Sequence, residues 1–330
     1  MMTRLAPDED FAYTRIFDPD LPGPSAGGLP PAEAGHPWAS TASSDPPGGD
    51  RRPPGGYVFS PRVVLAVNVA LATGRPLLVR GEPGSGKSSL AAAVADHAEW
   101  DLYQQTITSR TAAQDLLWSF DALRRLHDAQ VRLDVTDLAR YVRPGALWSA
   151  LDPVGAREVA GSSAVAETGG RERAVILVDE IDKAEPDVPN DLLEPLGTFT
   201  FTVADLGERR VRNTRPQPPL VIITTNGERD LPPAFLRRCA VLTMPFPDPG
   251  RLVEIAVRHF GPDHYDLYVD VAGRLAAVRS EAAASRAQAP GTAEYLDAVR
   301  ACLELGIGAD GTSAAWREAQ AATLAKWEQP

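Results

Sequence analysis

The segment GEPGSGKSSL at residues 81–90 holds side chains whose types and spacing are suited to chemistry. It fits the pattern G-x-x-x-x-G-K-[ST]. Glycines let backbone N–H groups turn inward around an anion, and a helix start behind them adds partial positive charge. Lys87 would reach the β- and γ-phosphates of a nucleotide, and the Ser88 hydroxyl would hold Mg²⁺. The pattern predicts a phosphate loop made of Gly81, Glu82, Pro83, Gly84, Ser85, Gly86, Lys87, Ser88 and Ser89.

Two acids, Asp179 and Glu180, end the apolar run in ILVDEID. Ligands of an open α/β sheet bind at the carboxyl ends of its strands. A hard cation beside phosphates prefers a carboxylate, so Asp179 is expected to hold Mg²⁺ directly or through water. Glu180 is expected to orient and deprotonate an attacking water. A strand that ends in Asp-Glu is by itself as often a solvated strand end, but with the upstream loop it predicts one hydrolytic metal–phosphate site.

Asn226 ends a second apolar run, VIITTN, and is expected to hydrogen-bond the γ-phosphate or the water. The alternative is a simple turn, because Asn before Gly is a common turn pair. The segment TTNGERD differs from the Asn-Lys-x-Asp pattern that reads guanine, so the expected nucleotide is ATP rather than GTP.

Arg237 and Arg238 stand side by side shortly afterwards. Adjacent side chains point to different sides, so one can face the interior while the other projects from the surface toward a neighbour. A guanidinium is suited to neutralising charge on a transferring phosphoryl group. The alternative is a solvated pair at a helix end.

Strands and helices of an α/β fold must position these residues. A helix is expected from Ser60-Pro61 to Gly74, followed by a strand over PLLV, the phosphate loop and its helix. Further strands are expected at 101–107, 174–182 and 219–226, and their continuous apolar runs indicate a buried parallel sheet. Beyond Pro249 the pattern is entirely helical. The fold class is therefore a parallel sheet flanked by helices, followed by a small all-helical domain.

Three parts of the chain follow from these patterns. Residues 1–56 contain 11 Pro and 8 Gly and are expected to form a flexible arm. Its segment FAYTRIF (11–17) is either a docking motif or, in the favoured interpretation, a few apolar residues of a loose tail. Residues 57–248 are expected to form the nucleotide-binding domain, and residues 249–330 a separate all-helical unit.

Composition excludes several classes of protein. The net charge is −11, which argues against nucleic-acid binding as the main activity because that binding needs a cationic surface. Only Cys239 and Cys302 are present, so there is no disulfide framework, and both are expected to be small buried residues. The start of the chain lacks the apolar core of a signal peptide, and no long apolar run occurs, so a cytoplasmic location without membrane contact is expected.

The ordered set GEPGSGKS, ILVDEID, IITTN and LPPAFLRR resembles the AAA+ ATPases, and more narrowly their MoxR-like branch, over residues 57 to about 305. The resemblance implies a homo-oligomeric ring, usually of six subunits, with ATP and Mg²⁺ at each subunit boundary. By this analogy Lys87 and Ser88 belong to Walker A, Asp179 and Glu180 to Walker B, and Asn226 is sensor 1. Arg237 or Arg238 would be the arginine finger. The resemblance also implies that residues 108–151 are that branch's insertion in the second helix and that residues 249–330 form the lid domain.

The family usually places a basic residue just before the lid motif that stands here as APGTAEYLDAVRA (289–301), whereas this sequence has Gln288 and Ala289 there. Arg286 is the nearest candidate for sensor 2. The resemblance also implies a chaperone-like remodeller, often with a von Willebrand factor A-type partner, or a component of a bacterial conflict or signalling system.

Two segments are candidates for partner contact. DLLWSFDALRRLHDAQVRL places Leu116, Leu117, Phe120, Leu123 and Leu126 at helical spacing, which favours burial against the body over contact with a client. GERRVRNTRPQ (207–217) carries four arginines and is expected in a hairpin, where it is either a solvated loop or a surface for an acidic partner.

Three readings of function remain open: a remodelling ATPase, a nucleotide-gated binding switch with very slow turnover, and a nucleic-acid motor. Only the arginine loop favours the third.

Overall fold

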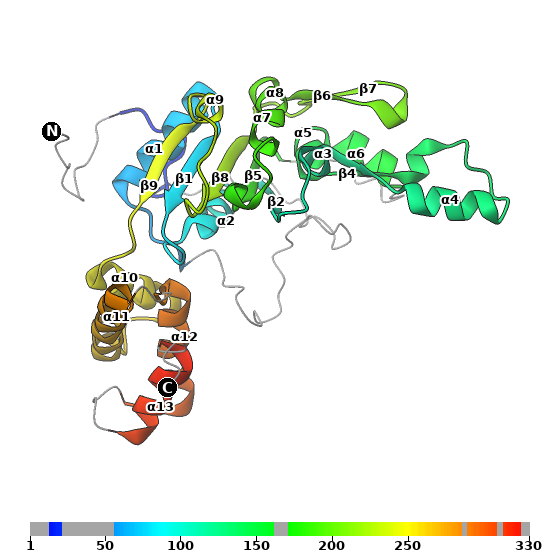
Figure 1. Cartoon of the computed structure of the whole chain (residues 1–330). Helices are drawn as coiled ribbons and strands as arrows, with labels where there is room; N and C mark the ends of the chain where they lie inside the picture. Colours follow the sequence, from blue (N-terminus) through cyan, green and yellow to red (C-terminus); the bar gives the residue numbers. More distant parts are fainter. Residues whose placement is uncertain (1–12, 22–55, 162–170, 286–288, 309–312, 325–330) are drawn as a thin grey trace. The chain divides into compact units, whose positions relative to one another are not determined.

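The computed structural model describes residues 13–21, 56–161, 171–285, 289–308 and 313–324 (Figure 1). Contacts between residues divide the chain into two units. Among the described residues, the first unit holds 13–21, 59–80, 91–161 and 171–243, and the second holds 56–58, 81–90 and everything from Met244 onward. The two units are described separately below.

A five-stranded sheet forms the centre of the first unit (Figure 1). Its order is β2 (Asp101–Thr106), β5 (Ala174–Asp179), β8 (Leu220–Thr225), β1 (Leu77–Gly81) and β9 (Ala240–Met244). The pairs β2–β5, β5–β8 and β8–β1 are parallel, and Arg80 lies opposite Thr225. The carboxyl ends of these strands therefore meet at one edge, and the expected parallel α/β fold is confirmed.

The central strands are buried on both faces, as their continuous apolar sequences predict. All six residues of β8 are buried, as are the first five of β5. Helix α1 (Pro61–Thr73) begins at Ser60, whose side chain accepts a hydrogen bond from the Val63 N–H, and ends at Gly74 in the left-handed conformation. Helix α2 (Lys87–His97) follows the phosphate loop.

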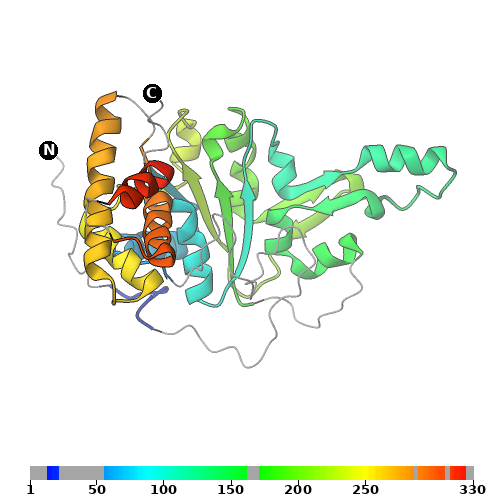
Figure 2. The same ribbon diagram turned by 90° about the horizontal axis from the view of Figure 1, so that it is seen from below.

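The insertion forms a small subdomain beyond the β2 edge of the sheet, and in both ribbon views it lies on the same side as the β6–β7 hairpin (Figures 1 and 2). It contains α3 (Ala113–Leu117), β3 (Trp118–Phe120), α4 (Ala122–Gln130), the 3₁₀ helix Leu138–Tyr141, β4 (Val142–Pro144), α5 (Ala146–Leu151) and α6 (Pro153–Ala160). The hairpin consists of β6 (Thr200–Val203) and β7 (Arg209–Arg212). The Trp118 ring stacks on Phe201 at 5.9 Å, so the insertion packs on the hairpin.

The expected burial of the insertion helix holds for only part of it. Leu116 and Leu117 are buried, whereas Leu123 and Leu126 are 81% and 57% exposed. The helical spacing correctly indicates an apolar stripe, but α4 extends past the body, so nothing in the described part of this unit covers its second half. The prediction that all these side chains pack against the body is therefore wrong for Leu123 and Leu126.

Short elements complete the first unit, among them the 3₁₀ helices Ile181–Lys183 and Ala204–Leu206, α7 (Val188–Asp191), α8 (Leu193–Thr198) and α9 (Pro233–Leu236). Strand β9 was not anticipated from the sequence. Its burial alternates with exposure, so it lacks the continuous apolar run that marks β5 and β8.

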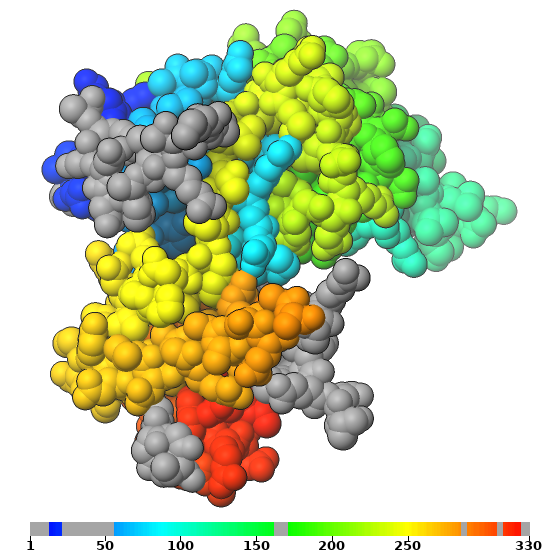
Figure 3. Space-filling model, turned by 60° about the vertical axis from the view of Figure 1, so that its left-hand side comes forward, coloured from blue at the N-terminus to red at the C-terminus, as the bar shows by residue number. Residues whose placement is uncertain are grey.

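The second unit contains the phosphate loop and four helices, α10 (Pro249–Phe260), α11 (Tyr265–Ser285), α12 (Thr292–Leu305) and α13 (Ala314–Thr323). These helices appear in yellow to red in Figure 3. They enclose their own apolar core, which includes Leu252, Tyr268, Tyr295, Val299 and Trp316. The expected all-helical C-terminal region is confirmed.

Most of the expected flexible arm lies outside the described residues. Its described part, residues 13–21, is packed on the first unit, with Phe17 only 2% exposed. The favoured interpretation of a loose tail is therefore wrong at Phe17. Among the described residues, no helix has the length and apolar character needed to cross a membrane.

Candidate functional site

The phosphate loop uses glycine where the backbone turns. Gly84 and Gly86 have φ angles of +75° and +88°, in the left-handed region that residues with a Cβ avoid. A Cβ on Gly84 would also stand 2.5 Å from the Gly291 Cα. Ser85 is buried, and within the part of the chain that the structure describes its Oγ makes no hydrogen bond. A turned backbone with an unsatisfied polar group at its centre fits an anion.

Lys87 is the first residue of α2 and is buried to 6% exposure. Its Nζ donates hydrogen bonds to the carbonyl oxygens of Gly81 at 2.9 Å and Glu82 at 2.8 Å. The ammonium group is therefore held at the loop backbone by two acceptors. This placement fits the expected role of Lys87 as a phosphate ligand.

The loop also contacts a lid helix within the second unit. Arg279 of α11 donates from Nη2 to Glu82 Oε2 at 2.5 Å and from Nη1 to the Pro290 carbonyl at 2.6 Å. Its guanidinium lies 3.5 Å from the centre of the Phe246 ring. Arg286, the expected sensor 2 residue, lies outside the described residues. Arg279 is thus the described lid arginine that contacts the loop.

The acids and Asn226 come together at the carboxyl edge of the sheet in the first unit. Thr224 links them: its Oγ1 donates to Asp179 Oδ1 at 2.5 Å and accepts from the Glu180 N–H at 2.9 Å. Asn226 Nδ2 donates to Glu180 Oε1 at 3.4 Å. Three side chains that the sequence predicted to act together are therefore neighbours, and a threonine on β8 orients two of them.

Glu180 is held in an unusual backbone conformation, with φ 60° and ψ 50°. Non-glycine residues in this region carry strain of about 1–3 kcal/mol and cluster at functional sites. Its carboxylate accepts from Lys183 Nζ at 2.6 Å, and this partner raises the pKa of the Lys183 ammonium. Glu180 is therefore oriented by its backbone, by Asn226 and by a cation.

Asp182 orders the turn that carries Asn226. It is 3% exposed, and its Oδ2 accepts hydrogen bonds from the N–H groups of Asn226 at 3.2 Å and Glu228 at 2.9 Å. A buried carboxylate with two backbone donors fixes the start of this loop, so that the Asn226 side chain points toward Glu180.

Both arginines after α9 are exposed at the surface of the first unit. Neither of them therefore faces the interior, which was the possibility raised for one of the two. Arg237 is the C-cap residue that follows the short helix, and Arg238 comes next, before buried Cys239. Among the described residues neither guanidinium forms an ion pair with a carboxylate, so both are accessible to a second molecule.

The arginine-rich segment divides into structural and exposed residues. Arg215 is buried and pairs with Asp101 Oδ2 at 2.7 Å, while Arg209 lies 3.5 Å from Glu158 and over the Trp148 ring. Arg210 and Arg212 are exposed on β7. The four arginines therefore do not form a uniform basic loop for an acidic partner, because only Arg210 and Arg212 are exposed.

Sequence reasoning missed four residues at these places: Thr224, Asp182, Lys183 and Arg279. Asp182 and Lys183 stand in the quoted acidic segment, and Thr224 precedes Asn226 by two positions, so proximity in sequence was an available signal. Arg279 contacts a loop residue 197 positions away, and no spacing in the sequence indicates that contact.

The donor set fits ATP with Mg²⁺. Lys87 and the loop N–H groups are anion donors, and Ser88 and Asp179 offer the hard oxygen ligands that Mg²⁺ prefers. The required residues are present in two places: the loop in the second unit and the acidic cluster in the first.

A family model described as AAA domain (dynein-related subfamily) matches residues 76–239. A solved structure of RuvB from Thermotoga maritima, a proline-to-glycine mutant, is 17% identical, covering 76% of this chain and 71% of that one, with a TM-score of 0.40. No curated protein matches the sequence.

Proposed function

We propose that the chain is an ATP-hydrolysing remodelling ATPase of the MoxR-like AAA+ type, which acts on protein partners and shares its ATP sites between subunits of a ring. The observation that carries the proposal is the linked cluster of Asp179, Thr224, Glu180 and Asn226 at the carboxyl edge of the sheet. Strand β1 ends at this edge, since Arg80 lies opposite Thr225, and the phosphate loop follows it directly in the chain.

Each residue has a part in this proposal. Lys87 and the loop N–H groups bind the phosphates, while Ser88 and Asp179 hold Mg²⁺. Bound ATP supplies the phosphoanhydride bond that is cleaved. Glu180 accepts the proton of the attacking water, and Asn226 orients that water from the neighbouring strand end.

A ring is proposed because Arg237 and Arg238 are exposed. Since both can reach a second molecule, either can neutralise charge in a neighbouring subunit's site. Shared sites convert hydrolysis into movement between subunits, because the γ-phosphate contact exists only before cleavage. Clients would then be macromolecules, including a von Willebrand factor A-type partner.

The test is ATP turnover against protein concentration for the wild-type chain, and for Arg237→Ala and Arg238→Ala each mixed with Lys87→Ala. A shared site predicts that specific activity rises with concentration. It also predicts that one of the mixtures regains part of the lost activity, because a subunit with an intact arginine completes the site of one with an intact Lys87. Flat specific activity and no regain would contradict the ring.

A nucleotide-gated binding switch is the second candidate, and the Lys183–Glu180 contact of 2.6 Å favours it. The ion pair occupies one oxygen of the carboxylate that would accept the proton of the water. In this case ATP binding persists while turnover is slow, and Lys183→Met raises kcat. The remodelling ATPase instead predicts fast turnover that Lys183→Met lowers or leaves unchanged. Glu180→Gln provides the zero-turnover control for both.

A further inference from the structure

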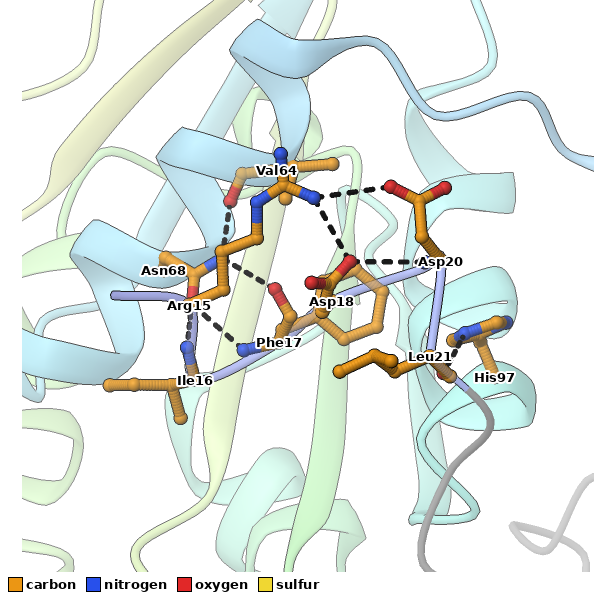
Figure 4. Close-up of polar contacts among 9 residues, drawn as sticks. All are labelled: Arg15, Ile16, Phe17, Asp18, Asp20, Leu21, Val64, Asn68 and His97. Atoms are coloured by element: carbon orange, nitrogen blue, oxygen red, sulfur yellow. Dashed lines mark hydrogen bonds and ion pairs between the residues drawn. The ribbon is translucent and has the colours of Figure 1, made fainter. Parts of the chain in front are cut away.

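Residues 13–21 form a compact segment with internal contacts of its own (Figure 4). The Arg15 guanidinium pairs with Asp18 at 3.0 Å and Asp20 at 3.2 Å. The Asp20 N–H donates to Asp18 Oδ1 at 3.0 Å, and the Leu21 N–H donates to the Asp18 carbonyl at 3.3 Å. The hydrogen bond from the Asp20 N–H and the charge of Arg15 lower the pKa of Asp18. The segment therefore contains a turn that is held together by its own side chains and backbone.

Asn68 of α1 binds the backbone of this segment. It is 4% exposed, in a helix whose other buried residues are apolar. Its Oδ1 accepts from the N–H groups of Ile16 at 2.5 Å and Phe17 at 2.8 Å, and its Nδ2 donates to the Phe17 carbonyl at 2.7 Å (Figure 4). The fourth hydrogen bond, to the Val64 carbonyl at 2.9 Å, stays within α1.

This arrangement matters because a buried amide without partners is costly. A buried polar group without a hydrogen-bond partner lowers the free energy of unfolding by about 1–3 kcal/mol. Three of the four hydrogen bonds of Asn68 exist only while the segment is in place. Asn68 is thus satisfied mainly by the backbone of the segment, and only one of its four hydrogen bonds lies within its own helix.

The one buried side chain of this segment, that of Phe17, packs in an aromatic pocket. The Phe17 ring lies 5.3 Å from Phe59 and 5.9 Å, edge to face, from His97 at the end of α2. His97 Nε2 also lies 2.9 Å from the Leu21 carbonyl oxygen. Burial of a phenylalanine contributes about 1.5–3 kcal/mol. The pocket therefore adds a side-chain requirement to the backbone contacts of Asn68.

From these contacts we propose that α1 and α2 form a reversible peptide-binding site, and that its occupant is the chain's own segment 13–21, bound in cis. The ligand class is an extended peptide with a phenylalanine followed by an aspartate turn. This proposal does not depend on nucleotide hydrolysis.

Occupancy in cis follows from the tether. The 34 residues 22–55 join the segment to the body, and a chain of that length spans up to about 110 Å when extended. A tethered ligand has an effective concentration on the order of mM, whereas a second copy of the chain is present at far lower concentration. The chain's own segment therefore outcompetes that of a neighbour.

The experiment uses a fluorescein-labelled peptide of residues 11–22 and the full-length chain with Phe17→Ala, whose own segment no longer fills the pocket. Fluorescence anisotropy is expected to show binding to this variant that is at least about tenfold tighter than to the wild-type chain. The peptide with Phe17→Ala is expected not to bind. Equal binding to both chains, or no binding to the variant, overturns the proposal.

A second pair of measurements tests the contribution of the hydrogen bonds between Asn68 and the backbone of the segment. A peptide that is N-methylated at Ile16 lacks one of the N–H donors, and it is expected to bind the Phe17→Ala chain at least about fivefold more weakly. Because only the peptide changes, this result does not depend on the folding of a protein variant. Unchanged affinity would show that the backbone contact is not used.

The mass of the nucleotide-free chain distinguishes cis from trans. Light scattering is expected to give the same molar mass for the wild-type chain and for Phe17→Ala. A drop in mass for the variant would place the segment in a neighbour's groove and overturn occupancy in cis.

Discussion

Thr224 is the residue that connects the two acids of the site. Its hydroxyl donates to Asp179 and accepts from the Glu180 N–H, so one side chain fixes both the proposed metal ligand and the proposed base. It is completely buried, which leaves the hydroxyl no water with which to replace either contact. The geometry of the site therefore depends on a residue that needs no contact with nucleotide.

Thr224→Val tests this role, because valine has a similar shape without the hydroxyl. We expect kcat to fall at least about tenfold while ATP affinity changes less than about threefold, because only the orientation of Asp179 and Glu180 is disturbed. Steady-state turnover and nucleotide titration measure the two effects. Thr202→Val, on an exposed position of β6, is the matched control. Unchanged kcat would show that the acids are positioned in another way.

Cys239 gives a prediction about pH. Burial raises the pKa of its thiol to about 11, and it is 8% exposed. Because the thiolate reacts, labelling of the folded chain by a disulfide reagent is expected to be slow at pH 7 and to rise about tenfold per pH unit toward 11. In the unfolded chain the thiol has its ordinary pKa near 8.5.

The raised pKa of Cys239 also determines how the stability of the chain changes with pH. Above about pH 8.5 the unfolded chain loses a proton that the folded chain keeps, so the free energy of unfolding decreases as pH rises toward 11. Labelling kinetics with and without guanidinium check the first prediction. Fast labelling of native Cys239 at neutral pH would contradict it.

At the scale of elements, Arg215 joins several parts of the first unit. Besides its pair with Asp101 at the start of β2, it donates to the Ala150 carbonyl of α5 at 2.6 Å and to the Tyr103 hydroxyl at 3.1 Å. Its side chain is completely buried. The segment after the β6–β7 hairpin is thus anchored to the edge of the sheet that carries the insertion.

Arg215→Met is expected to lower the free energy of unfolding by about 3 kcal/mol, because it removes the closest cation from the Asp101 carboxylate and the donor from the Ala150 and Arg171 carbonyls. Urea unfolding measures the loss. Arg212→Ala, an exposed position of the same segment, is expected to change stability by less than about 0.5 kcal/mol. Equal effects of the two substitutions would contradict the structural role.

Some of the helices and strands could be predicted from the sequence, and others could not. Strands β5 and β8 were predictable because all of β8 and the first five residues of β5 are buried, and buried parallel strands have continuous apolar sequences. Strand β9 was not, because its alternating burial leaves no such run. The apolar stripe of α4 was visible in the sequence, but whether a neighbour covers Leu123 depends on tertiary structure.

The residues of the candidate site also fall into those that could be predicted from the sequence and those that could not. Lys87, Asp179 and Glu180 were predictable because phosphate and metal chemistry fix both the residue types and the spacing. The Arg279 contact with Glu82 was not, because it joins residues 197 positions apart. Asn68 was not singled out either, since its partners in the N-terminal segment become neighbours only on folding.

For the whole molecule, charge decides against a nucleic-acid motor. The net charge is −11, and of the four arginines near β7 one is buried and another lies against Glu158. Few cations remain at this surface to displace counterions from a nucleic acid. We therefore expect no submicromolar affinity for single- or double-stranded DNA at about 0.15 M salt.

Fluorescence anisotropy with labelled oligonucleotides measures this affinity, and a salt titration provides the control. Tight binding that weakens steeply with salt would contradict the expectation and would favour the motor.

Helix α2 has one further consequence. It begins at Lys87, beside the phosphate loop, and ends at His97, which contacts Phe17 and Leu21 of the N-terminal segment. Eleven residues span about 16 Å of continuous helix. A cysteine introduced at Ile16, which is 51% exposed, could be labelled selectively with a fluorophore, because both native thiols are buried. The emission of such a dye would report whether the N-terminal segment stays in contact with the end of α2.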